Sequence, residues 1–347
     1  MKESDSMKTP SINQPKLFKS YDNLDSSTKN LFSGIKTEIE LISKKNGVTL
    51  IVVDESLQLG GNNFSLKGKI IDGDKIVNNV RIKISNSENK NTDMERELYM
   101  INYIEKMGYP VPKIYLDGVT NSKNHFYIQE FILGKNVREI KTNKFKIYNK
   151  IQNFFIDLHS NTSLPGYGKI YNDHGVWKGE SSTWSNALRD KLKLSFRRTY
   201  AADLIKDHDL EDKLLEILEI NNNILNVGEA KSLLHGDAGL INFMGYKNEL
   251  VAILDPEFAV VGDPAYEFSD KIGEKNDYSF DFLQKYIRGI TDKGININSD
   301  SFLRRGLIYS PFIVADIIPN LWEAGNTEGA KYFISILPDE IQKALMA

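Results

Sequence analysis

The chain has 347 residues, of which 41% are hydrophobic and 26% charged, as in a soluble globular protein with two domains or two lobes. A net charge of −3 lacks the positive excess that is typical of nucleic-acid binding. No apolar run approaches the ~20 residues that span a bilayer. The absence of cysteine excludes disulfides and thiolate sites. The N-terminus has no apolar core of a secretory signal, so we expect a cytoplasmic protein.

The N-terminal region predicts a tail followed by a helix. Residues 1–22 are polar and contain two prolines, so we expect a mobile tail. A helix is predicted over residues 27–45, ended by Asn46-Gly47. Its apolar stripe consists of Leu31, Ile35, Ile39 and Ile42. The stripe predicts packing on the first lobe, with a partner-binding helix as the alternative.

From Thr49 onward the hydrophobic period changes to two, which indicates strands. Strand-like segments cover Thr49–Val53, Ser56–Leu59, Phe64–Ile71 and Ile76–Ile84, and two more cover Lys113–Val119 and His125–Phe131. These six segments are assigned to one antiparallel sheet, which is predicted to have five strands. A helix over Thr92–Met107 interrupts the strands.

One strand carries two basic residues on a single face. Alternation in Val80–Ile84 puts Arg81 and Lys83 on one side of the strand and the apolar residues on the other. The helix that follows offers two carboxylates, Glu95 and Glu97. A solvent-facing lysine and an exposed helix glutamate are the ordinary alternatives for these positions.

Beyond residue 134 the pattern is helical. Helices are predicted over Lys144–Ser160, from about Ser182, and over Leu210–Leu225, Phe280–Gly289, Ser301–Ile318 and Glu328–Ala347. His159, at the end of the first of these, is expected to be a packing residue.

Two short apolar runs, Ser232–Leu234 and Leu250–Leu254, interrupt the helical pattern. Each ends in acids, His235-Gly236-Asp237 and Asp255-Pro256-Glu257, and Asn242 lies between them. Apolar runs that stop at carboxylates indicate buried strands that deliver acids to a cleft. Phosphoryl transfer needs such a set: an acid that orients the attacking hydroxyl, and a carboxylate and an amide that hold Mg²⁺.

The order and spacing of Asp237, Asn242 and Asp255 resemble the catalytic loop and metal site of protein kinases. Gly236 stands in place of the usual arginine, and Pro256-Glu257 in place of Phe-Gly. With Gly262-Asp263-Pro264, these departures resemble the aminoglycoside phosphotransferase (APH)-like family of small-molecule kinases. This family also includes choline, fructosamine, homoserine and methylthioribose kinases.

The resemblance implies an α+β, two-lobed, protein-kinase-like fold. Its N-lobe, residues 23–133, would hold an antiparallel sheet with a helix and bind the nucleotide. Its C-lobe, residues 134–347, would be mostly helical and carry the catalytic and acceptor-binding groups.

The resemblance also assigns roles to residues of this chain. Asp237 would orient or deprotonate the acceptor hydroxyl, and Asn242 and Asp255 would bind Mg²⁺. Lys83, held by Glu97, would touch the α- and β-phosphates of ATP or GTP. His235 would support the loop rather than act as a base, and Asp263 would brace it from a helix N-terminus.

Two further assignments rest on position in the family pattern. Gly60, Gly61 and Asn62 would cover the phosphates, with a bare hairpin turn as the alternative. Backbone groups of Glu130 and Ile132 would read the adenine edge.

The implied reaction moves the γ-phosphate to a hydroxyl of a small molecule, first of all an aminoglycoside-type antibiotic. The alternatives are a metabolic kinase of the methylthioribose, fructosamine, choline or homoserine type, a protein kinase, or a pseudokinase binding module. Gly236 and the seven residues between Asp255 and Asp263 disfavour a protein kinase. The complete set of Lys83, Asp237, Asn242 and Asp255 disfavours a pseudokinase. Acids after residue 263 are mixed with basic residues, which leaves the acceptor open.

Overall fold

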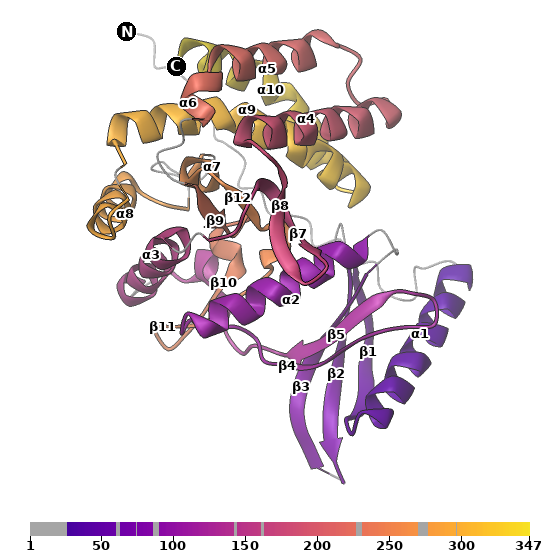
Figure 1. Ribbon diagram of the computed structural model, residues 1–347. Coiled ribbons are helices and arrows are strands. Elements are labelled where there is room, and N and C mark those ends of the chain that lie inside the picture. Colours follow the sequence, from indigo (N-terminus) through magenta and orange to yellow (C-terminus); the bar gives the residue numbers. More distant parts are fainter. Residues whose placement is uncertain are drawn as a thin grey trace, which may run out of the picture.

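A computed structural model describes residues 26–59, 63–73, 75–85, 90–141, 144–160, 163–226, 231–269, 277–295 and 297–347. The predicted tail over residues 1–22 lies outside the described residues, as do Gly60, Gly61 and Asn62. Figure 1 shows two lobes, with a sheet in the first and a mostly helical second lobe.

The first lobe is built on a five-stranded antiparallel sheet in the order β1-β2-β3-β5-β4. The strands are β1 (Thr49–Leu59), β2 (Asn63–Asp72), β3 (Lys75–Ser85), β4 (Ile114–Val119) and β5 (His125–Glu130). The five-stranded prediction is therefore confirmed. The segments predicted at 49–53 and 56–59 belong to a single strand, because irregularities in its pairing with β2 break the alternation without ending the strand.

Two helices cover opposite faces of this sheet (Figure 1). The first, α1 (Ser26–Lys45), packs Ile35 and Ile39 against a core that includes Ile82 and Ile84 of β3. The packing predicted for the apolar stripe is thus confirmed for Ile35, Ile39 and Ile42, and the side chain of Leu31 lies outside the described residues. Because side chains alternate along a strand, Lys83 lies on the other face, where it meets α2 (Asn91–Lys106).

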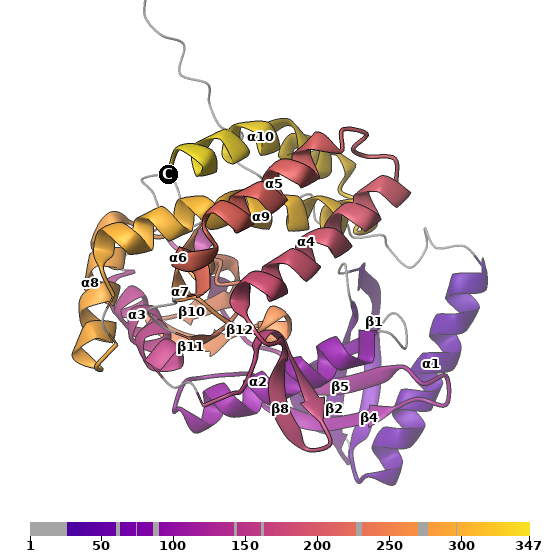
Figure 2. The ribbon, with the colours of Figure 1, turned by 45° about the horizontal axis from the view of Figure 1, so that its top comes forward.

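The second lobe contains most of the helices. They are α3 (Phe145–Ser160), α4 (Trp184–Ala201), α5 (Asp209–Ile220), α6 (Asn222–Asn226), α7 (Pro264–Phe268), α8 (Phe280–Asp292), α9 (Ser299–Glu323) and α10 (Thr327–Met346). In both views α4, α5, α9 and α10 form the layer farthest from the first sheet, and α3 lies beside α8 (Figures 1 and 2). No helix in the described ranges is both long enough and apolar enough to cross a membrane.

Some helix boundaries differ from the prediction. The helix expected from about Ser182 begins at Trp184, because the hydroxyl of Thr183 accepts the N–H of Asn186 and caps it. The single helix expected over residues 210–225 is divided into α5 and α6 at Asn221. His159 is fully buried beside Phe155 and Phe268, so its assignment as a packing residue is confirmed.

A β-hairpin in the second lobe was not predicted. Its strands, β7 (Tyr167–Asp173) and β8 (Val176–Ser181), are joined by His174 and Gly175, both with positive φ, as two-residue hairpin turns require. Trp177 stacks on Tyr99 of α2 with ring centroids 4.2 Å apart, which docks the hairpin on the first lobe. The hairpin continues into a four-stranded sheet, β8-β7-β12-β9, with β9 (Ser232–Leu234) and β12 (Val260–Gly262).

A smaller sheet carries the other half of the site. Its order is β11-β10-β6, with β6 (Lys135–Asn136), β10 (Phe243–Tyr246) and β11 (Glu249–Ile253). It joins the segment after β5, which leads into the 3-10 turn η3 (Val137–Glu139), to the two strands that lie between the acidic motifs.

Candidate active site

The loop after β9 is fixed by a buried carboxylate. Glu267 of α7 accepts the N–H of His235 at 2.6 Å and the N–H of Gly236 at 3.1 Å. The ring of His235 is fully buried, and its Nε2 lies 3.0 Å from the carbonyl oxygen of Leu254. His235 therefore ties this loop to the end of β11, in a position that supports the loop.

The predicted place of Asp263 at a helix N-terminus is confirmed, but its hydrogen bonds to described residues do not reach the loop. Asp263 caps α7, since its carboxylate accepts the N–H of Ala265 at 2.9 Å, and it also binds Arg305 and Tyr309 of α9. The brace is Glu267, four residues later. No local pattern favours Glu267 over Asp263, because the contact of Glu267 with His235 crosses 32 positions of the chain.

Gly236 occupies a place that no other residue fits. Its φ is +83°, and a Cβ added there would lie 1.9 Å from the carbonyl oxygen of Phe258. An arginine at this position, as in protein kinases, would collide with backbone. The absence of that arginine is thus built into the local packing.

Asp237 and Asn242 are joined directly. The side-chain amide of Asn242 donates to the carbonyl oxygen of Asp237 at 2.9 Å and to its Oδ2 at 2.8 Å. The backbone carbonyl of Asn242 accepts the N–H of Leu254 at 2.8 Å, which places Asn242 next to Asp255. Because the amide nitrogen is used by Asp237, the amide oxygen is the end left for a cation.

Asp255, just after β11, is a partly exposed carboxylate. Its φ is +54°, a conformation that aspartate tolerates, and its side chain is 39% exposed. Burial alone would raise the pKa of Asp255, but the charges of Lys83 and Arg81 outweigh it and lower the pKa below its usual range. Its carboxylate and the amide oxygen of Asn242 are hard oxygen donors. They fit Mg²⁺, which takes few protein ligands and completes its shell with phosphate and water.

Lys83 forms a buried ion pair with Glu97. Its Nζ lies 2.6 and 2.9 Å from the two carboxylate oxygens of Glu97 and 3.0 Å from Oδ1 of Asp255. Burial would lower the pKa of Lys83, but Asp255 and Glu97 raise it well above its usual value, so the ammonium is kept. Glu95 is exposed, and Arg81 donates to the hydroxyl of Ser65.

Arg96 is a site residue that the sequence did not reveal. It is 3% exposed, and it donates to the carbonyl oxygens of Ile170 in β7 (2.6 Å) and Glu257 (2.9 Å) and to the carboxylate of Asp93 (2.7 Å). The helix that carries Glu97 is thereby locked to the segment that carries Asp255. A fixed α2 keeps the Lys83–Glu97 pair in place.

Glu257 lies in the same charged cluster. The side-chain amide of Asn63, at the start of β2, donates to its Oε2 at 2.7 Å. Burial and the carboxylates of Glu97 and Asp255 raise the pKa of Glu257 to about 8, against the opposing effect of Lys83. The contact with Asn63 joins the end of an inner strand of the first sheet to the second lobe.

The two backbone positions expected at the adenine edge differ in their hydrogen bonding. The N–H of Glu130 donates to the carbonyl of Lys113 at 2.8 Å, so this N–H is already used within the sheet. Ile132 lies past the end of β5 and makes no backbone hydrogen bond to any described residue.

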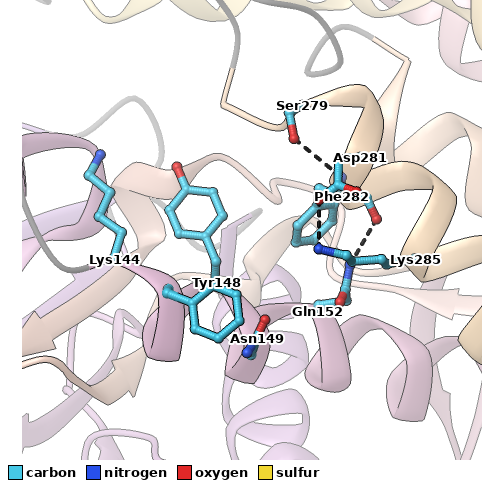
Figure 3. A pocket seen from close by; sticks show the side chains of 9 residues that line it. Lys144, Tyr148, Asn149, Gln152, Ser279, Asp281, Phe282 and Lys285 are labelled. Carbon is cyan, nitrogen blue, oxygen red and sulfur yellow. Dashed lines mark hydrogen bonds and ion pairs between the residues drawn. The ribbon is translucent and has the colours of Figure 1, made fainter.

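A separate hollow of about 300 Å³ lies between α3 and α8, away from the acidic motifs (Figure 3). Tyr148 and Phe282 form its aromatic wall, and Lys144 and Lys285 lie at its rim. None of the residues predicted for the site lines it.

Several solved structures share this fold. One is a complex of a thermostable mutant of aminoglycoside phosphotransferase APH(4)-Ia with AMP-PNP and hygromycin B. Its identity is 14%, it covers 89% of this chain and 98% of that chain, and its TM-score is 0.62. A candidate fructosamine-3-kinase from Haemophilus somnus 129PT has 16% identity, covers 88% of this chain and 98% of that chain, and has a TM-score of 0.63.

A third similar structure is the GDP and kanamycin complex of APH(2")-IIia, with 14% identity, coverage of 88% of this chain and 98% of that chain, and a TM-score of 0.60. No curated protein matches the sequence. At these identities the likeness establishes the α+β kinase-like fold.

The family follows from the sequence itself. The sequence model of the phosphotransferase enzyme family (APH) matches residues 77–292, more than half of the chain. The match begins in β3 and includes both acidic motifs. The chain belongs to the phosphotransferase enzyme family.

Proposed function

We propose that this kinase transfers the γ-phosphate of ATP or GTP to a hydroxyl of a small molecule, with Asp237 as the residue that receives that hydroxyl. The observation that carries the proposal is the contact between Asn242 and Asp237, at 2.8 Å, in a loop tied to the residue before Asp255. This contact supports an arrangement in which the acid for the acceptor and the oxygen donors for Mg²⁺ lie in two adjacent loops, after β9 and after β11.

Each group has a role that follows from its position. Asp237 is half-buried and orients the acceptor hydroxyl, accepting its proton as the bond to phosphorus forms. Lys83, held by Glu97, neutralises phosphate oxygens. Asn242 and Asp255 hold Mg²⁺, which supplies further charge neutralisation when bound. Because the transition state of phosphoryl transfer is loose, positioning and charge contribute more than the proton affinity of the acid.

The donor side includes three further positions. The main chain of Glu130 and Ile132 would contact the adenine edge, where Ile132 offers an N–H that no described residue uses. Gly60, Gly61 and Asn62 would cover the phosphates. The related structures with AMP-PNP and with GDP support a nucleoside triphosphate donor of either kind.

For the acceptor, an aminoglycoside-type antibiotic is the first candidate, because related structures hold hygromycin B and kanamycin. A metabolic sugar or amino alcohol is the second candidate, favoured by the pairing of acids in the second lobe. Asp316 pairs with Lys191, Glu323 with Arg198, and Asp277 with Arg138. Carboxylates neutralised in this way attract the ammonium groups of an aminoglycoside less than free ones would.

The local structure argues against peptide acceptors. Between Asp255 and Asp263 the chain forms only the 3-10 turn Pro256–Phe258 and strand β12, so it has no long segment on which a peptide would bind. Gly236 excludes the arginine that reads a phosphorylated loop. The retained ion pair of Lys83 with Glu97 argues against a pseudokinase.

The test is a thermal-shift screen of aminoglycosides, sugars and amino alcohols with a non-hydrolysable nucleotide and Mg²⁺. Each hit is then assayed for transfer of labelled γ-phosphate. We expect an acceptor that raises Tm only with nucleotide present and is phosphorylated. Phosphorylation of a peptide library, or nucleotide binding without phosphate loss to any acceptor or to water, would contradict the proposal.

A further inference from the structure

The catalytic loop is held on a second side by two residues that precede α8. The N–H of Leu240 donates to Oδ2 of Asp277 at 2.7 Å, and the hydroxyl of Tyr278 donates to the carbonyl of Ala238. These contacts bracket Gly239, whose carbonyl accepts the N–H of Asn242 at 2.9 Å. The turn between Asp237 and Asn242 is therefore bound to residues 37 and 40 positions away.

Asp277 is itself held by two other elements. Arg138 of η3 binds it through two parallel hydrogen bonds, Nε to Oδ1 at 3.0 Å and Nη2 to Oδ2 at 2.7 Å. The hydroxyl of Tyr148, in the wall of the hollow in Figure 3, donates to its carbonyl oxygen at 3.3 Å. The Asp277 side chain is only 11% exposed. A bidentate arginine contact fixes orientation as well as distance.

Arg138 also interacts electrostatically with Asp237. The paired hydrogen bonds with Asp277 raise the pKa of Arg138, and Asp237 adds to the effect. The guanidinium of Arg138 therefore lies within electrostatic range of the Asp237 carboxylate. Because Nε and Nη2 of Arg138 both donate to Asp277, the cation is held beside the loop.

We propose that Asp277, oriented by Arg138, is a positioning residue that holds the Ala238–Leu240 turn and so aims Asp237 at the acceptor hydroxyl. The inference rests on the proposed phosphotransfer function. Among the described residues, Asn242 is the sole hydrogen-bond donor to the Asp237 carboxylate, so the aim of Asp237 depends on its backbone. A displacement of about 1 Å at a reacting group costs on the order of 100-fold in rate.

The experiment compares Asp277→Ala with Asp281→Ala, which removes an acid four positions later that forms an exposed pair with Lys285. Transfer to the acceptor found by screening gives kcat and KM, and single-turnover release of γ-phosphate to water provides a readout independent of the acceptor. We expect Asp277→Ala to lower kcat by about 10- to 100-fold, with nucleotide Kd and KM within about twofold of the wild type. Asp281→Ala should match the wild type.

Two further variants separate positioning from loss of structure. Arg138→Ala should lower kcat similarly. The variant with both changes should have a kcat no lower than that of the less active single variant, because both changes release the same turn. Tyr278→Phe removes only one hydroxyl and tests the other side of the turn if Asp277→Ala does not fold. It should lower kcat by about threefold or more with an unchanged nucleotide Kd.

An unchanged kcat in folded Asp277→Ala, or additive effects of the Asp277 and Arg138 changes, would overturn the inference. A fall in kcat matched by an equal loss of nucleotide binding would also do so, since it would mean general damage to the lobe. If the wild type released no phosphate to any acceptor or to water, the proposed function itself would fail, which is a different result.

Discussion

Lys83 and Glu97, from strand β3 and helix α2, form a buried ion pair with distances of 2.6 and 2.9 Å to the two carboxylate oxygens. Neither partner contacts water freely, because Lys83 is 7% and Glu97 1% exposed. The pair points toward Asp255, whose Oδ1 is 3.0 Å from the ammonium. It links the sheet of the first lobe to the segment of the second lobe that carries Asp255.

The two residues should behave as one unit in kinetics. Lys83→Ala and Glu97→Ala should each lower kcat/KM, and the double variant should be close to Lys83→Ala alone, because Glu97 acts through the lysine. Glu95→Ala should be nearly silent, since helical geometry turns residue 95 about 200° away from residue 97. Additive losses, or coupling of Glu95 to Lys83 in a double-mutant cycle, would contradict the assignment of Glu97 as the functional partner of Lys83.

Asp255→Ala should abolish Mg²⁺-dependent nucleotide binding. The variant loses the proposed metal ligand and a partner of Lys83, so its affinity for the Mg²⁺-nucleotide complex should fall by at least about tenfold. Calorimetry with Mg²⁺ and with chelator measures both affinities for wild type and variant. The difference between the two proteins should disappear in chelator. An unchanged affinity in Mg²⁺ would place the metal elsewhere.

Gly236→Ala should damage the loop more than other glycine replacements. The new Cβ would lie 1.9 Å from the carbonyl oxygen of Phe258, so backbone must move. We expect a loss of about 2 kcal/mol or more in unfolding free energy. Gly175→Ala is the matched control, since Gly175 also has positive φ but nothing lies within 4 Å of its Cβ position. Equal losses in chemical denaturation would show that strain alone, and not the contact, matters at Gly236.

Asp316 should make the free energy of unfolding fall as the pH is lowered into the acid range. Burial acts to raise the pKa of Asp316, but Lys191 and Ser195 outweigh it and lower the pKa. A lowered folded-state pKa gives stability that is present above the unfolded value of about 4 and is lost as pH falls through the folded value. Asp316→Asn should therefore cost about 1–3 kcal/mol at pH 7 and progressively less below about pH 4.

The control for this prediction is Asp281→Asn, whose exposed pair with Lys285 should contribute little at any pH. Urea unfolding at several pH values measures both variants. A gap between wild type and Asp316→Asn that stays constant down to pH 2 would contradict the linkage.

Local signals explain what could be predicted from the sequence. The five-stranded sheet follows from alternation within single segments, and the apolar stripe of α1 follows from helical spacing. The acidic motifs stand out because each ends a short apolar run, so Asp237 and Asp255 needed no long-range information. The choice of Lys83 and Glu97 depended on the family pattern, since alternation alone gave Arg81 the same face.

Long-range contacts explain what could not be predicted. Arg96 meets Ile170 across 74 positions and Glu257 across 161, and Glu267 meets His235 across 32. Nothing local distinguishes these side chains from solvated ones. The β7–β8 hairpin was missed because its turn residues, His174 and Gly175, do not form one of the common hairpin pairs.

The most direct test of the account is the activity of Asp237→Asn. The replacement keeps the size of the side chain and leaves Lys83 and Asp255 untouched, so the protein should fold and bind Mg²⁺-nucleotide with wild-type affinity. Single-turnover transfer of labelled γ-phosphate to the acceptor should fall by about 100-fold or more, because the hydroxyl loses its proton acceptor. Near-wild-type transfer by this variant would remove Asp237 from the mechanism and contradict the proposed reaction centre.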